Sequence, residues 1–118
     1  MKPEVKTQFD RILREVREAA QKAGDNAKVR QITVCGQVVD GVCGFAWINI
    51  PGRGNFAKYA KEVLGASKNY GGKGYNIWSS KVYETTSQSC ERREAACEAA
   101  ANVLRSYGLK ATMNSRLD

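Results

Sequence analysis

The stretch ITVCGQVVDGVCGFAWINI, residues 32 to 50, decides the fold class. It is rich in β-branched and aromatic residues, which favour strands, and it contains Asp40-Gly41, a common type I′ turn pair. The pattern predicts a β-hairpin in which Ile32–Val39 pairs with Val42–Ile50. Antiparallel pairing is therefore the expected basis of the sheet.

The predicted turn also sets the register of this hairpin. With two residues in the turn, Val38 lies opposite Cys43, and Cys35 lies opposite Ala46. The two cysteines then lie on opposite faces of the hairpin, so no disulfide is expected between them.

Helices are predicted on both sides of the hairpin. From Val5 to Ala23 apolar residues recur at steps of three and four, which indicates one amphipathic helix that Gly24 ends. After the hairpin, Asn55 is a suitable N-cap for a short helix that reaches Leu64. Both helices have one apolar side that can cover a sheet.

The second half of the chain repeats the alternation of strands and helices. Tyr75–Tyr83 reads as a strand, bent at Ser79-Ser80 into a second hairpin, and a long helix begins near Ser89. Gly108 followed by Leu109 predicts a Schellman-type end of this helix, and Leu109–Ser115 forms a last strand. The predicted order α-β-β-α-β-β-α-β indicates an α+β fold, an antiparallel sheet of about four to five strands with helices packed on one face.

Length and composition are those of one globular domain, residues 1 to 118. Hydrophobic residues make up 42% of the 118 residues, which is too many for a disordered chain. No apolar run approaches the ~20 residues that cross a bilayer, and the charged start is unlike a signal segment. We expect no membrane contact and a location in the cytoplasm of the host cell.

The chain has four cysteines and no histidine. The cysteines form no CxxC pair, so we expect free thiols that pack as small core residues, and neither a metal nor another cofactor is predicted. Without histidine the commonest general base is missing. Cys90 beside Arg92 is the best nucleophile candidate, but it lacks a base, so the sequence predicts a protein that is not an enzyme.

The net charge of +7 is concentrated in the centre of the chain. Residues 51 to 83 hold six basic side chains and one acidic one, interleaved with asparagine, tyrosine and tryptophan. Basic groups bind phosphates and aromatic faces stack on bases, so this mixture predicts an anionic ligand, either a nucleotide or single-stranded nucleic acid. The alternative is a lysine-rich surface that meets only solvent.

A candidate phosphate cradle follows the predicted hairpin. Gly52 and Gly54 allow close approach of the backbone to an anion, Arg53 adds a forked charge, and Asn55 stands at a helix start with free N–H groups. No Gly-Lys-Ser/Thr follows, so this is not a P-loop. A turn that needs these residues for geometry alone is an equal alternative.

A second candidate lies at the start of the last helix. Gln88, Ser89 and Arg92 stand near its positive end, although neighbouring glutamates can pair with the arginine. Arg116 is a further candidate for a phosphate contact. The side chains predicted to stack on a base are Phe45, Tyr70 and Trp78.

These residues give the sequence a resemblance to a set of small proteins of tailed bacteriophages, from about residue 43 to the end. The shared motifs are Gly44–Trp47, the turn and helix Gly52–Leu64, Gly71–Trp78, the helix start Gln88-Ser89, Glu94-Ala95, and the closing Ser115–Asp118. The first helix, residues 1 to 24, is not part of the pattern.

Within that set the chain resembles the anti-Thoeris sponge proteins, which bind and sequester cyclic ADP-ribose isomers, and in some cases cyclic oligonucleotides, made in bacterial immunity. The resemblance implies a non-catalytic homo-oligomer with ligand pockets between subunits, and site roles for Arg53, Gln88, Ser89 and Arg116. Two other functions stay open: a phage nucleic-acid-binding accessory protein, and an inhibitor that binds a host protein.

A homodimer is also expected from the last helix. Its alanines, Ala95, Ala96, Ala99, Ala100 and Ala101, spread over more than one face. Such a helix packs closely on two sides, and symmetric pairing commonly supplies a second side. We expect the first or last helix at the interface, with the ligand close to it.

Overall fold

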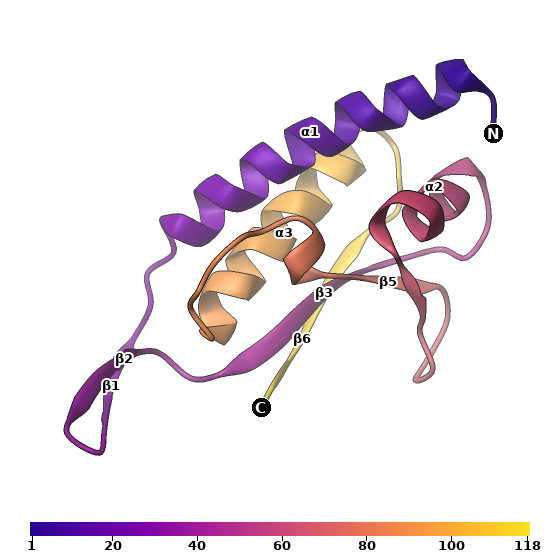
Figure 1. Cartoon of the computed structure of the whole chain (residues 1–118). Helices are drawn as coiled ribbons and strands as arrows, with labels where there is room; N and C mark the ends of the chain where they lie inside the picture. The colour runs from indigo at the N-terminus through magenta and orange to yellow at the C-terminus, as the bar shows by residue number, and fades with distance from the viewer.

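The computed structural model describes the whole chain, residues 1 to 118, and Figure 1 shows its helices and strands. The elements are α1 (Pro3–Asp25), β1 (Gln31–Val34), β2 (Gln37–Asp40), β3 (Gly44–Ile50), α2 (Asn55–Leu64), β4 (Ser67–Lys68), β5 (Tyr75–Trp78), the 3₁₀ helix η1 (Ser79–Lys81), α3 (Cys90–Ser106) and β6 (Thr112–Leu117).

A four-stranded antiparallel sheet carries the core on one of its faces. Its strand order is β4-β5-β3-β6. Side chains alternate along β3, and the buried ones are Gly44, Ala46, Ile48 and Ile50. All three helices pack on that face, around Ile48 and Ile77. The predicted α+β class, an antiparallel sheet with helices on one face, is confirmed.

α3 lies between α1 and β3 and contacts both. Its residues Ala96, Ala100 and Ala101 have no exposed surface, because small side chains let the helix approach neighbours on two sides. The second side is therefore filled by α1 of the same chain. The alanine pattern does not indicate a second subunit, contrary to the reasoning from sequence.

The predicted hairpin around Asp40-Gly41 is wrong. β1 pairs instead with β2, and the turn between them is Cys35-Gly36, with φ angles of 51° and 78°. A type I′ turn needs positive φ at both central residues, and only this pair provides it, since Asp40 is the last residue of β2. The predicted oppositions of Val38 to Cys43 and of Cys35 to Ala46 are wrong for the same reason, since Val38 lies opposite Thr33.

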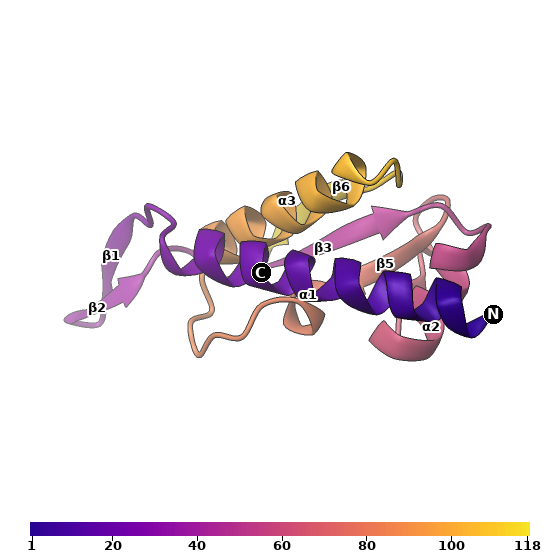
Figure 2. The ribbon, with the colours of Figure 1, turned by 90° about the horizontal axis from the view of Figure 1, so that it is seen from above.

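The β1–β2 hairpin forms an arm that projects from the rest of the chain (Figure 1 and Figure 2). β3 does not join it, because β3 pairs with β5 and β6 in the main sheet. In the main sheet the helices cover one face of the apolar strand β3. A two-stranded arm cannot provide such cover.

Other boundaries differ from those predicted. Asn55 is the first residue of α2, and Gly54, with φ of 95°, occupies the N-cap position. The strand from Tyr75 ends at Trp78, and the chain turns through η1 instead of a second hairpin. This turn brings the buried Tyr83 back into the core.

Helix ends were predicted more accurately. Ser89 caps α3, since its hydroxyl oxygen accepts a hydrogen bond from the Arg92 backbone N–H. At the other end Gly108 has φ of 80°, and the Leu109 N–H donates to the Leu104 carbonyl at 3.1 Å, as a Schellman ending requires. The last strand begins after this ending, at Thr112 and not at Leu109.

All four thiols are free. Cys90 and Cys97 are buried, as predicted for small core residues, whereas Cys35 and Cys43 are exposed, so the prediction is wrong for these two. No helix of the chain combines the length and the apolar character needed to span a membrane.

Candidate functional site

The face of the sheet that the helices leave uncovered holds aromatic, amide and basic side chains. We call it the open face. Residues directly opposite each other in a sheet share a face, and the pairs here are Trp47 with Trp78 and Phe45 with Arg116. The other members include Asn49, Asn76, Thr112 and Asn114.

A pocket of about 420 Å³ opens where β3 begins and β5 has ended. It is lined by Phe45, Ala46, Trp78, Ser79, Ser80, Tyr83, Thr85, Arg93 and Arg116, and we call it the aromatic–arginine pocket. Its volume is within the usual range for small-molecule sites, about 300 to 1,000 Å³. Its lining contains no carboxylate.

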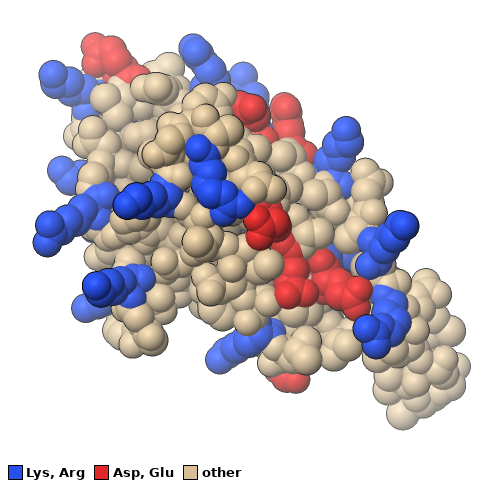
Figure 3. All heavy atoms as spheres, turned by 180° about the vertical axis from the view of Figure 1, so that it is seen from behind, with Lys and Arg blue, Asp and Glu red and all other residues tan.

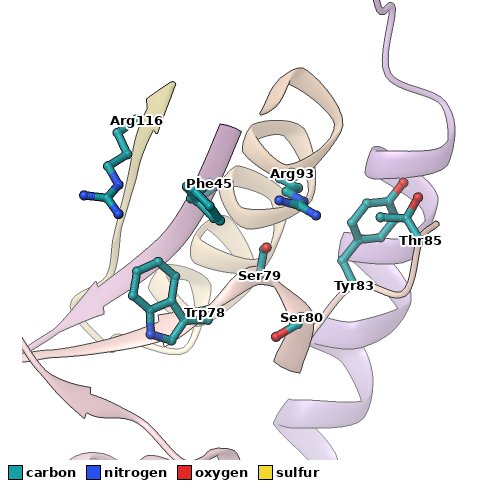
Figure 4. Close-up of a pocket in the computed structure, with 9 residues that line it drawn as sticks. Phe45, Trp78, Ser79, Ser80, Tyr83, Thr85, Arg93 and Arg116 are labelled. Atoms are coloured by element: carbon teal, nitrogen blue, oxygen red, sulfur yellow. The ribbon is translucent and has the colours of Figure 1, made fainter. Parts of the chain in front are cut away.

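Two guanidinium groups flank one aromatic ring in this pocket. The Cζ atom of Arg116 lies 5.4 Å from the centre of the Phe45 ring, and that of Arg93 lies 6.0 Å from it. Figure 4 shows Phe45 between the two arginines, with Trp78 beside it. Neither arginine forms a salt bridge, since the three salt bridges of the chain join other residues.

The backbone fixes Arg93 in this arrangement. Its Nη1 donates to the Gly44 carbonyl at 2.6 Å, and its Nη2 donates to the Ser87 carbonyl at 3.5 Å. Carbonyl partners leave the positive charge uncompensated. The arrangement therefore presents two positive charges and an aromatic face to one cavity, which suits a ligand with a planar ring and an anionic group.

A second hollow, of about 920 Å³, lies at the far end of β3. We call it the basic cleft. It is lined by Asn49, Pro51, Gly52, Arg53, Lys68, Lys73, Gly74, Lys110, Ala111 and Thr112, with four cations and no carboxylate. The cations come from three separate segments, the β3–α2 loop, the β4–β5 hairpin and the α3–β6 loop. Figure 3 shows basic side chains prevailing at the end of the molecule away from the arm.

Hydrogen bonds hold the wall of the basic cleft in place. The Lys73 carbonyl accepts from Nδ2 of Asn49 at 3.0 Å and from Nδ2 of Asn69 at 3.2 Å. The Asn69 backbone N–H donates to the Gly74 carbonyl at 3.0 Å. Lys68 and Lys73 are thus carried by a closed loop that is fastened to β3.

The candidate residues fall into separate places. Phe45, Trp78 and Arg116 meet in the aromatic–arginine pocket, whereas Gly52 and Arg53 line the basic cleft. Gly54 and Asn55 stand at the start of α2 and line neither. Tyr70 is 91% exposed on the loop between β4 and β5 and lines neither hollow.

The candidates at the start of α3 make contacts within the chain. The Gln88 carbonyl accepts from the Gly44 N–H at 3.2 Å, and Ser89 caps the helix. Arg92 pairs with Asp40, Nε to Oδ2 at 2.7 Å, and donates to the Gly24 carbonyl at the end of α1. These contacts connect the start of α3 to the arm, to α1 and to β3.

Sequence reasoning chose Arg92 and not Arg93 as the site residue at the start of α3, although both arginines stand at that helix start. It also missed Lys110, which lies outside the central basic segment. Lys68 and Lys73 belong to that segment. The sequence therefore indicated their contribution to the charge, but not their position in a cleft. No pattern in the sequence shows that the three segments that carry these cations meet at one cleft.

Acid–base and metal chemistry have few groups to use here. No three side chains of Cys, Asp, Glu or His come together as a metal site would require. Burial raises the pKa of the Cys90 thiol, and Glu94 raises it further, which opposes formation of a thiolate nucleophile.

No family model, curated protein or solved structure matches this chain. What the chain binds must therefore be inferred from its own residues.

Proposed function

We propose that the aromatic–arginine pocket binds a phosphorylated nucleotide without chemical turnover. The observation that carries the proposal is the pair of guanidinium groups without a salt-bridge partner, Arg93 and Arg116, on either side of the Phe45 ring. A base stacks on Phe45 and Trp78, and the two arginines hold phosphate oxygens.

The arrangement suits a nucleotide better than a simple anion. A phosphate alone uses only the arginines, whereas the indole of Trp78, 36% exposed, and the half-buried Phe45 offer apolar surface to a ring. The hydroxyls of Ser79, Ser80 and Thr85 can bond to a sugar or a base edge.

The resemblance to phage sponge proteins makes the proposal more specific. Two of its motifs, Gly44–Trp47 and Ser115–Asp118, supply Phe45 and Arg116, which lie opposite each other across β3 and β6. We propose that the ligand is a cyclic nucleotide of bacterial immunity, a cyclic ADP-ribose isomer or a cyclic oligonucleotide. The protein sequesters it in the host cytoplasm.

We also propose that the protein is a homodimer, and the arm supports this. Val34, Val38, Val39 and Val42 are exposed on or beside the arm, and an isolated two-stranded hairpin is marginally stable in water. β3 follows the arm directly, so a second copy that packs on the arm lies near the Phe45 end of β3.

Light scattering should give about twice the 13.0 kDa of one chain, and Val38→Ser should shift the mass towards one chain.

Release of bound nucleotide tests the binding proposal. The protein is incubated with cyclic ADP-ribose, a 3′,5′-cyclic dinucleotide and ATP, separated from free nucleotide and denatured, and the released compounds are identified by mass spectrometry. We expect at least one to be recovered intact. Recovery of a chemically altered nucleotide would show an enzyme instead.

A matched pair of variants ties the binding to the pocket. Arg116→Ala removes one of the two guanidinium groups and should reduce the recovered nucleotide at least tenfold. Arg11→Ala removes the same charge from the exposed side of α1 and should leave recovery unchanged. Equal losses in both variants would contradict the assignment of the pocket.

A further inference from the structure

We infer that the open face also binds single-stranded nucleic acid, with one nucleotide in the aromatic–arginine pocket and neighbouring phosphates in the basic cleft. The inference rests on the proposed function, because it uses the nucleotide pocket as one end of the path. It adds a second activity and assigns the basic cleft a ligand, a phosphodiester backbone.

The two hollows are joined by one strand. Phe45 lines the pocket and Asn49 lines the cleft, and both lie on the open face of β3. Asn49 is four positions along the strand from Phe45, which is about 13 Å. A mononucleotide held in the pocket leaves the cleft empty, whereas a strand of several nucleotides can reach both.

Aromatic surface continues between the two ends. Trp47 lies midway and pairs with Trp78, with ring centroids 5.2 Å apart and an interplanar angle of 55°. Nε1 of Trp78 donates to the Ser67 hydroxyl at 3.3 Å, which steadies that ring. Stacking on aromatic side chains stabilises bound single-stranded bases, with little dependence on sequence.

The charges along the path are all of one sign. Arg93 and Arg116 stand at the pocket, and the four cations of the basic cleft stand at the other end. The open face between them carries neutral side chains, Trp47, Asn114 and Trp78. With no carboxylate lining either hollow, a polyanion is attracted along the whole path.

The chemistry favours a single strand over a duplex. Bases within a duplex are stacked on one another and cannot lie on Trp78 or Phe45, whereas bases of a single strand can. An acidic peptide matches the charges but leaves the aromatic surface without a partner.

Fluorescence anisotropy with labelled oligothymidylates of two, four, eight and twelve nucleotides tests the inference, with a twelve-base-pair duplex beside them. Affinity should rise from two to eight nucleotides and then level off, and the duplex should bind at least tenfold more weakly than the twelve-nucleotide strand. The logarithm of the association constant should fall linearly with the logarithm of the salt concentration, with a slope set by the number of phosphates contacted.

Variants of the basic cleft separate this inference from the proposed function. Lys73→Gln with Lys110→Gln should weaken binding of the eight-nucleotide strand about tenfold and reduce the salt slope by about 1.4, since each phosphate contact of a single strand contributes about 0.7. The same variant should bind thymidine monophosphate and cyclic ADP-ribose as the parent protein does. Lys22→Gln with Lys28→Gln, two lysines remote from the cleft, is the charge-matched control.

The outcomes are distinct. If the eight-nucleotide strand binds no tighter than the dinucleotide, or the duplex binds as well as the strand, the inference is overturned and the nucleotide pocket stands. The same holds if both double variants lose equal affinity. If no nucleotide and no oligonucleotide binds, the proposed function fails as well.

Discussion

Phe45 of β3 and Arg116 of β6 lie directly opposite each other in the sheet, with the Arg116 Cζ atom 5.4 Å from the centre of the Phe45 ring. The two residues are 71 positions apart in the chain, and antiparallel pairing brings them together. Neither is needed to fill the helix-covered core, because both point to the open face. Both side chains are therefore available to contact a ligand.

Replacing the Phe45 ring should weaken nucleotide binding while the fold persists. Phe45→Leu keeps apolar volume and removes the stacking surface, which is worth about 1–3 kcal/mol for a base, or about 5- to 150-fold in the dissociation constant. Isothermal titration calorimetry measures the change, and a thermal melt checks that the variant is folded. Unchanged affinity in a folded variant would remove Phe45 from the site.

The ion pair of Asp40 with Arg92 should make the attachment of the arm depend on pH. The hydrogen bond from Arg92 lowers the pKa of the Asp40 carboxyl, so the native state prefers the charged form. Its stabilising effect is complete above the ordinary aspartate range and is lost as the pH falls through the lowered pKa, below about 4.

Asp40→Asn tests this relationship. At pH 6 the variant should unfold at a lower denaturant concentration than the parent, and its β1–β2 amides should exchange hydrogen faster. At pH 3 the difference should shrink, because the aspartate of the unfolded chain is then largely protonated and the pH approaches the lowered pKa of the native carboxyl. A difference that is equal at pH 3 and pH 6 would show that the ion pair does not stabilise the fold.

Gly74 should tolerate no side chain. Its φ is 86°, and a Cβ atom there would lie 2.1 Å from the Ile50 carbonyl oxygen. Gly74→Ala should lower the free energy of unfolding by more than about 2 kcal/mol, because left-handed strain and a backbone clash add. Gly71→Ala, where the nearest atom is 3.9 Å away, should change it by less than about 0.5 kcal/mol. Chemical denaturation of both variants measures the contrast.

The four thiols should divide into two classes. Cys35 and Cys43 are exposed and should react with a thiol reagent at pH 8 in the native protein. Burial raises the pKa of Cys97 to about 12 and also raises that of Cys90, so neither forms a thiolate readily. We expect two reactive thiols in the native state and four after denaturation. Rapid native reaction of all four would contradict the burial of Cys90 and Cys97.

The elements with local signals could be predicted from sequence, and their pairing could not. The apolar period of α1, the Ser89 cap and the Gly108 ending depend on neighbouring residues only. The sequence predicted a turn at Asp40-Gly41, whereas the hairpin turns at Cys35-Gly36. Choosing between them required knowing that β3 is buried by helices on one face, which is a property of the whole fold.

The candidate site shows the same limit. The sequence predicted an anionic ligand, with Phe45, Trp78 and Arg116 among the candidate site residues. No local sequence pattern indicated that these three residues share a pocket. Arg92 and Arg93 are adjacent in sequence and look equivalent there. One step of helix turns Arg92 towards Asp40 and α1, and turns Arg93 towards the Phe45 ring.

The central claim is that a nucleotide binds in the aromatic–arginine pocket, and amide and indole chemical shifts test it most directly. Protein labelled with ¹⁵N is titrated with cyclic ADP-ribose, and ¹H–¹⁵N spectra are recorded for backbone amides and for the Trp78 indole. The account predicts saturable shifts concentrated at Phe45, Trp78 to Ser80, Arg93 and Arg116, and their loss in Arg116→Ala. Saturable shifts confined to another surface, or no shift with cyclic ADP-ribose, a cyclic dinucleotide and ATP at millimolar concentration, would contradict it.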